Sequence, residues 1–357
     1  MRNTIGLLLL TALLLLSCGQ SPQVEAVQGE NPEPVSKETL MEHAAQLENL
    51  SEYAGTVFVP TMEHLIPADS NTVYCATLLF AWDEARKNIG TALSIPEKYQ
   101  DLRLLNASTS FRNVLKSNEY TASGVVSGDY IYTRAEFKKS LPFDYQLNKM
   151  EHRLTFTQQK VAAFGVKGDD SDDLTNIVKI LYYKNDNNFI IKLKPSDKEH
   201  DIVLFKTTKT YPTMATMEAV ADSLIELGQR ERKIQDLKWK YQFLSDDEIV
   251  IPDIDFDIST TFKKLIGNTF RANSLDYEIL QAWQRTAFKL NETGAEIASK
   301  AKVEICLSLE EEEEEVTKPT PKKMIFDKPF FLMLRRTDAQ HPYFVLHAVN
   351  AELMVKE

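Results

Sequence analysis

The side chains that could perform catalysis in this chain of 357 residues do not group into a known catalytic motif. The sequence contains no G-x-S-x-G element, no H-E-x-x-H helix, no P-loop and no dinucleotide-binding glycine fingerprint. Its histidines show none of the spacings of a zinc site, and they stand at positions 43, 64, 152, 200, 341 and 347. We therefore expect that the protein is not an enzyme and binds neither a metal nor a cofactor.

The acidic cluster DDSDD, residues 169–173, is the one stretch that suggests calcium chemistry. An EF-hand loop needs a glycine at its sharp turn and a terminal glutamate, and this cluster has neither at the required spacing. We interpret it as a solvated turn.

The three cysteines are too few for a disulfide framework. Cys75 lies in an apolar run and is expected to be a small buried hydrophobic residue. Cys306 falls on the polar side of a strand-like segment, where a thiol is accessible to oxidation. A chain of this length can bury a large core without disulfides.

The segment 284–309 has the most informative pattern of the chain, and it changes character at Gly294. Before the glycine stand Ala287, Phe288 and Leu290, an apolar run that indicates a strand. After it, alternate residues are small or apolar: Ala295, Ile297, Ser299, Ala301, Val303, Ile305 and Leu307. Since successive strand side chains point to opposite faces, this pattern predicts a strand with one face suited to a core.

An acidic loop follows this segment directly. Six glutamates, Glu310–Glu315, precede the sequence VTKPTPKK. Like charges repel one another and the two prolines prevent regular pairing, so we expect a solvated loop. A segment that is patterned as a buried strand but continues into an exposed loop is a candidate for two alternative positions.

Three motifs resemble motifs of the serpin family, and they follow one another along the chain in the same order as in that family. Residues 291–298, NETGAEIA, are similar to the hinge that precedes the reactive loop of serpins. Downstream, residues 326–330, FDKPF, resemble the family's F-x-x-P-F and lead into a closing hairpin. Upstream, IPDIDFDISTTFKKLIGNTF resembles the family's L-P-x-F-x-I followed by a segment ending in L-G.

The resemblance implies an α+β fold with a large central, mostly antiparallel sheet, smaller sheets, helices packed on them and an exposed reactive loop at about 295–325. It implies a suicide substrate of a serine or cysteine protease, whose cleaved loop inserts into the main sheet. The implied hinge residues are Glu292, Gly294, Ala295, Glu296, Ile297 and Ala298. The family's spacing from Glu292 places the attacked bond between Ser308 and Leu309.

A second interpretation is a non-inhibitory binding lipoprotein that keeps the serpin fold. It is favoured where the chain departs from the family. Tyr74 and Cys75 stand where the family has serine and proline, Leu346 replaces a glycine of the closing hairpin, and Ala351 replaces the terminal proline. The segment 90–135 is also short for the helices that cover the main sheet in serpins.

The N-terminus predicts export and lipid anchoring. Residues 1–17 form a signal peptide with Arg2 before a leucine-rich run, and Cys18 follows in a sequence that resembles the bacterial lipobox. We expect lipidation at Cys18, a flexible tether over 18–35, and a serpin-like domain over 36–357. The protein is then anchored to the bacterial membrane, expected to be the outer membrane, and faces the periplasm or the cell surface.

The rest of the sequence indicates an acidic domain, which we expect to be a monomer. The net charge of −11 does not favour nucleic acid as a partner. Helices are predicted from Ser36 to Leu50, over 73–89, and over 211–227 with Gly228 as the stop. A hairpin over 177–183 and 189–194 and a strand over 202–205 complete the expected elements.

Overall fold

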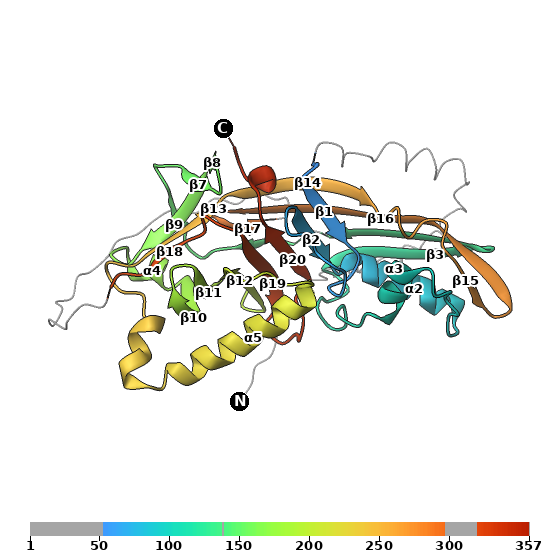
Figure 1. Ribbon diagram of the computed structural model, residues 1–357, viewed down its shortest axis with the longest axis horizontal. Helices are drawn as coiled ribbons and strands as arrows, with labels where there is room; N and C mark the ends of the chain where they lie inside the picture. The colour runs from blue at the N-terminus through green and yellow to red at the C-terminus, as the bar shows by residue number, and fades with distance from the viewer. Residues whose placement is uncertain (1–52, 138, 297–319, 357) are drawn as a thin grey trace, which may run out of the picture.

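A computed structural model describes residues 53–137, 139–296 and 320–356. In the described residues, three larger sheets, one two-stranded sheet and a few helices form an elongated α+β molecule (Figure 1). Most strand pairs are antiparallel, as expected, but each of the three sheets contains one parallel pair. Within the described ranges, none of the helices combines the length and the apolar character that crossing a bilayer would require.

The core sheet has seven strands, whose buried side chains make much of the hydrophobic core. In spatial order they are β1 (Thr56–Val59), β2 (Asn71–Cys75), β20 (Phe344–Ala348), β19 (Phe330–Arg336), β12 (His200–Lys206), β11 (Asn188–Leu193) and β10 (Val178–Asn185). Several of these strands are apolar on both faces because both faces are covered. The predicted hairpin is confirmed as β10 and β11, and the following strand as β12.

The hinge sheet holds the segment that precedes Gly294. Its strands are β3 (Tyr120–Ser127), β4 (Tyr130–Phe137), β16 (Leu275–Asn291), β17 (Gly294–Glu296) and β5 (Leu141–Pro142), with β14 (Ile254–Thr261) and β15 (Thr269–Ala272) paired to β16. Core-facing residues alternate with outer ones along β14 and the second half of β16, as a half-buried sheet requires.

Smaller elements complete the fold. A four-stranded sheet contains β18 (Lys323–Ile325), β13 (Glu248–Pro252), β9 (Ala163–Lys167) and β6 (Asn148–Lys149), and a separate hairpin contains β7 (Leu154–Phe156) and β8 (Gln159–Val161). The helices are α2 (Thr77–Ile89), α3 (Gln100–Ala107), α4 (Asp172–Thr175) and α5 (Met214–Glu231), with 3-10 turns η2 (Gln235–Tyr241) and η3 (Ala351–Leu353).

Helix α2 packs directly against β3. Gly124 of β3 is required there, because a Cβ atom at this position would lie 2.2 Å from the carbonyl oxygen of Ala81 and 2.3 Å from the nitrogen of Ala85. The helix ends at Gly90, whose left-handed backbone (φ 75°) closes the last turn. Figure 1 shows α2 and α3 beneath the long strands β3 and β16, and α5 along the opposite end of the molecule.

Two predicted helix boundaries are wrong. The helix expected over 73–89 begins at Thr77, since residues 71–75 form a fully buried strand, and a buried strand and a buried helix share a continuous apolar pattern. Gly228 does not stop α5 but lies within it. It is needed for packing, because a Cβ atom there would lie 2.0 Å from the carbonyl oxygen of Leu181.

Other expectations on single residues are met. Cys75 is buried at 1% exposure, and burial raises the pKa of its thiol to about 11. The acidic cluster at 169–173 begins in a turn and ends in the first two residues of α4, Asp172 and Asp173. Residues 90–135 hold one α-helix, α3, in addition to β3 and the first part of β4. The predicted helix from Ser36 to Leu50 lies outside the described residues.

Candidate functional site

A tight turn connects β16 to β17 at the predicted hinge. The side-chain oxygen Oδ1 of Asn291 accepts hydrogen bonds from the backbone nitrogen of Thr293 at 2.9 Å and from its hydroxyl at 2.7 Å. The carbonyls of Glu292 and Thr293 accept from the backbone nitrogens of Leu147 and Phe143, each at 2.9 Å. The turn is therefore fixed both internally and against the segment after β5.

Gly294 occupies a position that only glycine can fill. Its φ of +123° is a backbone conformation that residues with a side chain rarely adopt. A Cβ atom would also lie 2.5 Å from the carbonyl oxygen of Leu141 and 2.6 Å from Cα of Pro142. The hinge glycine is thus required by the close approach of β5.

Strand β17 lies between β16 and β5 and is antiparallel to both. Ala295 pairs with Leu290 on one side and Leu141 on the other, and it is only 2% exposed. This corrects the expected boundary of the exposed loop, because residues 294–296 already belong to the sheet. At the other end, Lys323–Ile325 forms β18, so strand structure resumes before residue 325.

Below β17, the strands β16 and β4 pair with each other directly. Residues 278–286 of β16 pair in parallel with residues 130–137 of β4, and the last pair is Thr286 with Phe137. Beyond that point the two partners separate and β17 enters between β16 and β5. We call this arrangement the fork (Figure 1). If β17 were longer, its next residues would have to lie between β16 and β4 and would separate these two strands.

A buried polar pair lies on the core side of β16 just below the fork. Gln284 and Thr286 are at most 1% exposed, and the amide nitrogen of Gln284 donates to the Thr286 hydroxyl at 2.9 Å. The amide oxygen of Gln284 is buried and has no hydrogen-bond partner in the structure. An unsatisfied buried acceptor costs on the order of 1–3 kcal/mol.

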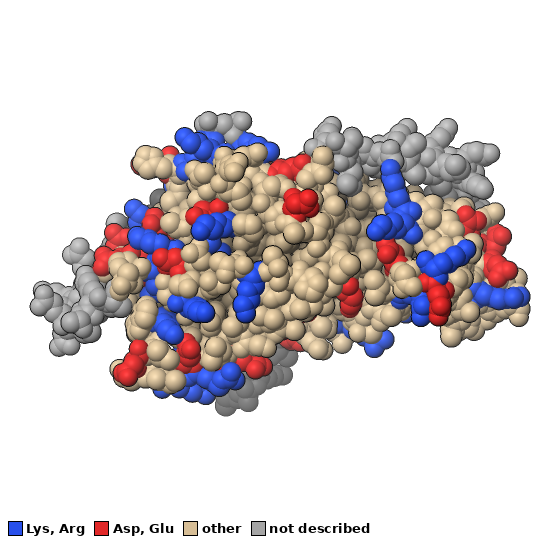
Figure 2. Space-filling view, viewed as in Figure 1, with Lys and Arg blue, Asp and Glu red and all other residues tan. Residues whose placement is uncertain are grey.

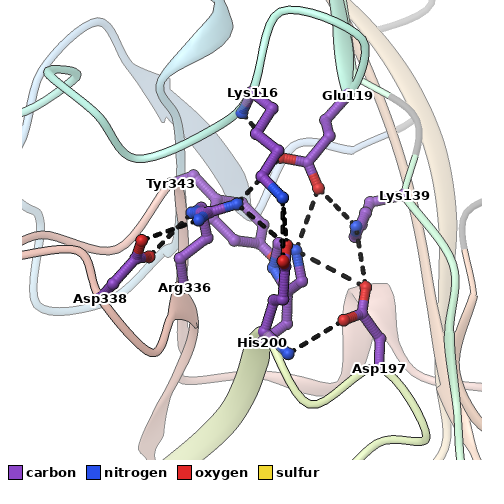
Figure 3. A network of polar contacts seen from close by, with 9 residues as sticks. Lys116, Glu119, Lys139, Asp197, His200, Arg336, Asp338 and Tyr343 are labelled. Carbon is purple, nitrogen blue, oxygen red and sulfur yellow. Dashed lines mark hydrogen bonds and ion pairs between the residues drawn. The ribbon is translucent and has the colours of Figure 1, made fainter.

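The other side of the fork is held by a polar network (Figure 3). The side chain of His200, on β12, is buried, and its Nε2 lies 3.0 Å from Glu119 Oε1 while its Nδ1 lies 3.1 Å from the Tyr343 hydroxyl. Lys139, in the link between β4 and β5, donates to Glu119 at 2.5 Å and to Asp197 at 3.2 Å. The network therefore ties the start of β3 and the β4–β5 link to the core sheet.

The charges of this network are set by burial and by neighbouring ions. Burial lowers the pKa of His200, and the positive charge of Lys139 lowers it further, so the ring is neutral at pH 7. Burial alone would raise the pKa of Glu119, but hydrogen bonds from the Lys139 side chain and the Lys116 backbone hold it below its usual value. The neutral ring donates from Nε2 to Glu119 and accepts from Tyr343 at Nδ1.

Three residues of the network, Asp197, Glu199 and His200, carry ligand-type atoms within 4.8 Å of one another. These atoms already have partners. Glu199 pairs with Lys116 at 2.6 Å and with Arg336 at 3.3 Å, Asp197 pairs with Lys139, and both His200 nitrogens are hydrogen-bonded. We interpret the cluster as an ion-pair anchor.

A buried carboxylate lies at the base of the hinge. Asp253, between β13 and β14, is 5% exposed, and its Oδ1 has no hydrogen-bond partner in the structure. Burial raises its pKa to about 6, and the negative charge of Glu292 contributes to the rise. The hinge turn therefore carries an unfavourable interaction between like charges above this pH.

The structure brings together four of the six predicted hinge residues, Glu292 and Gly294–Glu296. Ile297, Ala298, the candidate bond between Ser308 and Leu309, Cys306 and the lipidation site Cys18 lie outside the described residues. The sequence interpretation missed the buried pair Gln284 and Thr286, although two polar residues at core-facing register positions of an apolar strand were a usable signal. It also missed the network, whose members are far apart in sequence.

No protein family model matches the chain, and no curated protein matches it. Solved structures that are similar include a serpin from the trematode Schistosoma haematobium, with 9% identity and a TM-score of 0.36 over 62% of this chain and 56% of that one. Mouse protein-Z dependent protease inhibitor shows 12% identity and a TM-score of 0.37 over 62% and 55%. The thermophilic serpin tengpin in its native state shows 11% and 0.35 over 71% and 63%. The similarity thus spans little more than half of the length of the first two proteins.

Proposed function

We propose that this protein is a serpin-like peptidase inhibitor that acts as a suicide substrate. The observation that supports this most is the fork, in which β17 already occupies the first positions of an additional strand between β16 and β5. The hinge motif at 291–298 leads into this strand. Loop insertion into a sheet is an established mode of conformational switching.

In the proposed reaction, a serine or cysteine protease attacks the carbonyl of Ser308 and releases the amine of Leu309. The carbonyl carbon of Ser308 is then bonded to the enzyme, as an ester with a serine protease or a thioester with a cysteine protease. Continued pairing in the register of β17 places Ile297 opposite Phe288, Ser299 opposite Thr286 and Ala301 opposite Gln284. All three face the core side, since these residues of β16 are buried.

Insertion is favoured by two changes at the seam between β4 and β16. One parallel pairing is replaced by two antiparallel pairings, which are slightly more stable per residue. The core-facing side chains Ile297, Val303 and Ile305 gain about 1.5–3 kcal/mol each if fully buried.

Opening of the seam would also break side-chain interactions that cross it. The hydroxyl of Thr133 on β4 donates to the Gln281 carbonyl at 3.1 Å, and the guanidinium of Arg134 lies over the Trp283 ring at 5.0 Å. Both interactions are individually weak, because a neutral hydrogen bond contributes about 0.5–1.5 kcal/mol and a cation–π pair at an exposed site about 0.5–1 kcal/mol. The burial of the inserted side chains can therefore offset their loss.

Insertion also removes an unfavourable feature of the intact form. Ser299 would lie beside Gln284 on the core side, where its hydroxyl can donate to the amide oxygen that now lacks a partner. The Gln284 amide oxygen would thus lack a hydrogen-bond partner in the intact form and have one in the cleaved form. This difference would add about 0.5–1.5 kcal/mol in favour of insertion.

The exported inhibitor would be anchored to the membrane surface by lipidation at Cys18 and the tether at 18–35. It would act as a monomer. Figure 2 shows acidic and basic side chains interspersed on one face, without a field of one sign. We propose that the loop itself selects the protease, since a small residue at 308 suits an elastase-like enzyme.

A matched pair of substitutions tests the proposal. Ala301→Glu places a charge on the core-facing side of the inserted strand, and Lys300→Glu places the same charge on the outer side, opposite Arg285. The wild type and Lys300→Glu should form a covalent protease complex that survives denaturant. Ala301→Glu should be cleaved without trapping the enzyme.

Equal trapping by both variants would refute insertion in this register. Cleavage of the wild type by every protease of a serine and cysteine panel, with no complex and no rise in melting temperature, would leave the non-inhibitory binding lipoprotein as the function.

A further inference from the structure

A cavity of about 730 Å³ lies between the edge of the core sheet and the end of β14. Residues 57–60, at β1 and just after it, form one wall, the loop that contains Leu65 a second, and residues 259–265 a third. Two large apolar side chains are exposed beside the cavity. Leu65, which lines it, is 77% exposed, and Ile266, the residue after the third wall, is 37% exposed.

The wall formed by β1 is an open strand edge. Strand β1 stands at the end of the core sheet, and β2 is its strand partner in the described part of the chain. Four consecutive residues, 57–60, line the cavity. Because neighbouring strand residues point to opposite faces, such a run places the edge of the strand along the cavity, and not one face alone. Natural sheets often cover an open edge with a helix or a loop of the same chain.

The segment 36–50 is close enough in the chain to cover this edge. The described residues begin with Tyr53, whose carbonyl accepts from the backbone nitrogen of Thr56 at the start of β1, at 3.1 Å. Residues 51 and 52 connect the segment to this turn, and so short a link spans at most about 10 Å. A segment attached by a short link has an effective concentration in the millimolar range, so a weak attraction is enough to hold it.

The apolar pattern of the segment suits the cavity. Leu40, Ala44, Leu47 and Leu50 recur at spacings of four and three residues, which gives a helix over 36–50 one apolar side. An isolated helix of this length is marginally stable in water, so a stable helix here needs a surface to pack against.

The charges of the segment and of the cavity are complementary. The segment 36–50 carries three glutamates and one lysine. The cavity lining carries two exposed lysines, Lys263 and Lys264, against one acid, Asp101. A net negative segment is therefore attracted to this part of an otherwise acidic protein.

We propose that the segment 36–50 docks in this cavity as an amphipathic helix. Leu40, Leu47 and Leu50 pack between the edge of β1 and the end of β14, and the helix covers Leu65. Docking also fixes the point at which residues 18–35 leave the domain.

Hydrogen exchange of the full-length mature protein, followed by mass spectrometry, tests this docking. Peptides from residues 40–50 should exchange at least about tenfold more slowly than an unfolded chain, because the amides of an undocked helix of this length are little protected. Peptides from residues 19–34 should exchange at the rate of an unfolded chain. The same fast exchange over 40–50 would refute the proposal.

A pair of variants in the segment tests which side of the helix makes the contact. Positions 47 and 49 lie on opposite sides of a helix, since each residue advances it by about 100°. Leu47→Asp should return residues 40–50 to fast exchange, whereas Asn49→Asp, which adds the same charge, should keep them protected. Equal exchange in the two variants would exclude docking through the apolar side.

Variants of the cavity locate the docked segment. Ser259→Trp fills the cavity and should abolish the protection of 40–50, while slow exchange of β19 shows that the domain is folded. Leu65→Asp, at an exposed position that does not support the fold, should speed exchange of 40–50 about tenfold, and Val125→Asp, at an exposed position on β3, should leave it unchanged.

Protection that persists in a folded Ser259→Trp variant would refute the site. If that variant failed to fold, undiminished protection in Leu65→Asp would refute it. Protection that increases with protein concentration would assign the cavity to the segment of a second copy and would also overturn the proposal.

Discussion

At the scale of single residues, the geometry of the hinge restricts which residue types its positions can hold. Gly294 combines a φ of +123° with an approach to β5 that leaves no space for a methyl group. Asp253 is buried beside the Glu292 charge without a counterion for its Oδ1. The first residue stabilises the turn and the second destabilises it, so the hinge is held by opposing contributions.

Gly294→Ala should lower the stability of the intact protein by at least about 1–3 kcal/mol, because the added Cβ must displace the backbone at residues 141–143 and the φ is unfavourable. Chemical denaturation of the uncleaved protein measures the loss. Gly128→Ala is the matched control, because that glycine also has a positive φ but open space around its Cβ position. Equal losses in the two variants would show that strain alone, and not the approach of β5, determines the effect.

Asp253→Asn should make the protein more stable at neutral pH. The pKa of Asp253 is raised to about 6 in the folded state from a reference value of 3.8, so the folded state binds the proton more tightly than the unfolded state. Its contribution to stability is therefore fully present below pH 4 and is lost as the pH rises towards 6. A shift of this size corresponds to roughly 3 kcal/mol, and the asparagine variant should show this gain at pH 7.5 and none at pH 4.

The measurement is the free energy of unfolding as a function of pH for the wild type, Asp253→Asn and a control variant. Asp255→Asn is the control, since Asp255 is exposed on the outer face of β14 and pairs with Lys289 at 3.5 Å. A pH slope that is unchanged in Asp253→Asn would place the titrating group elsewhere.

At the scale of elements, the seam between β4 and β16 determines whether the hinge sheet can open. Gln284→Met removes a buried acceptor without a partner, a gain of about 1–3 kcal/mol, and the hydrogen bond to the buried Thr286 hydroxyl, a loss of about 0.5–1.5 kcal/mol. The intact protein should therefore gain about 1 kcal/mol in stability. Under the proposed function it should also slow loop insertion, so that more of the inhibitor is cleaved without trapping the protease. Stopped-flow measurement of complex formation, with the ratio of inhibitor cleaved to enzyme trapped, tests both effects.

Gln281→Met is a suitable comparison, since Gln281 is at the same seam but is half-buried and uses its backbone carbonyl, not its side chain, to contact Thr133. An identical effect of the two substitutions would indicate that the amide of Gln284 has no special role.

The sequence predicted the elements whose patterns are local. The hairpin β10–β11, strand β12 and the apolar run of β16 follow from alternation and from turn residues between strands. The α+β class and a hinge around Gly294 were implied by the resemblance, which includes residues 291–298. The sequence could not predict β17 beside β5, because that pairing joins Ala295 to Leu141, two residues that are distant in the chain. Nor could it separate β2 from α2, since both are buried and apolar.

At the scale of the whole molecule, the proposed function predicts that the intact and cleaved forms respond differently to changes at the seam and to changes in the polar network. The network joins β3, the β4–β5 link and the core sheet through Glu119, Lys139 and His200, and none of these three residues belongs to the paired stretches of β4 and β16. Opening of the seam therefore leaves the network intact. Its contribution to stability should be the same before and after insertion.

Lys139→Met should accordingly lower the stability of both forms by a similar amount, about 1–3 kcal/mol, because Glu119 loses the hydrogen bond from Lys139 but keeps those from the Lys116 backbone and His200. Gln284→Met should instead raise the melting temperature of the intact form and leave that of the cleaved form unchanged or lower. Calorimetry of each variant before and after cleavage of the loop gives both shifts. If Lys139→Met reduced the stability of only one form, the network would be part of the moving seam and not a fixed anchor, and the fork would have to open by a different path.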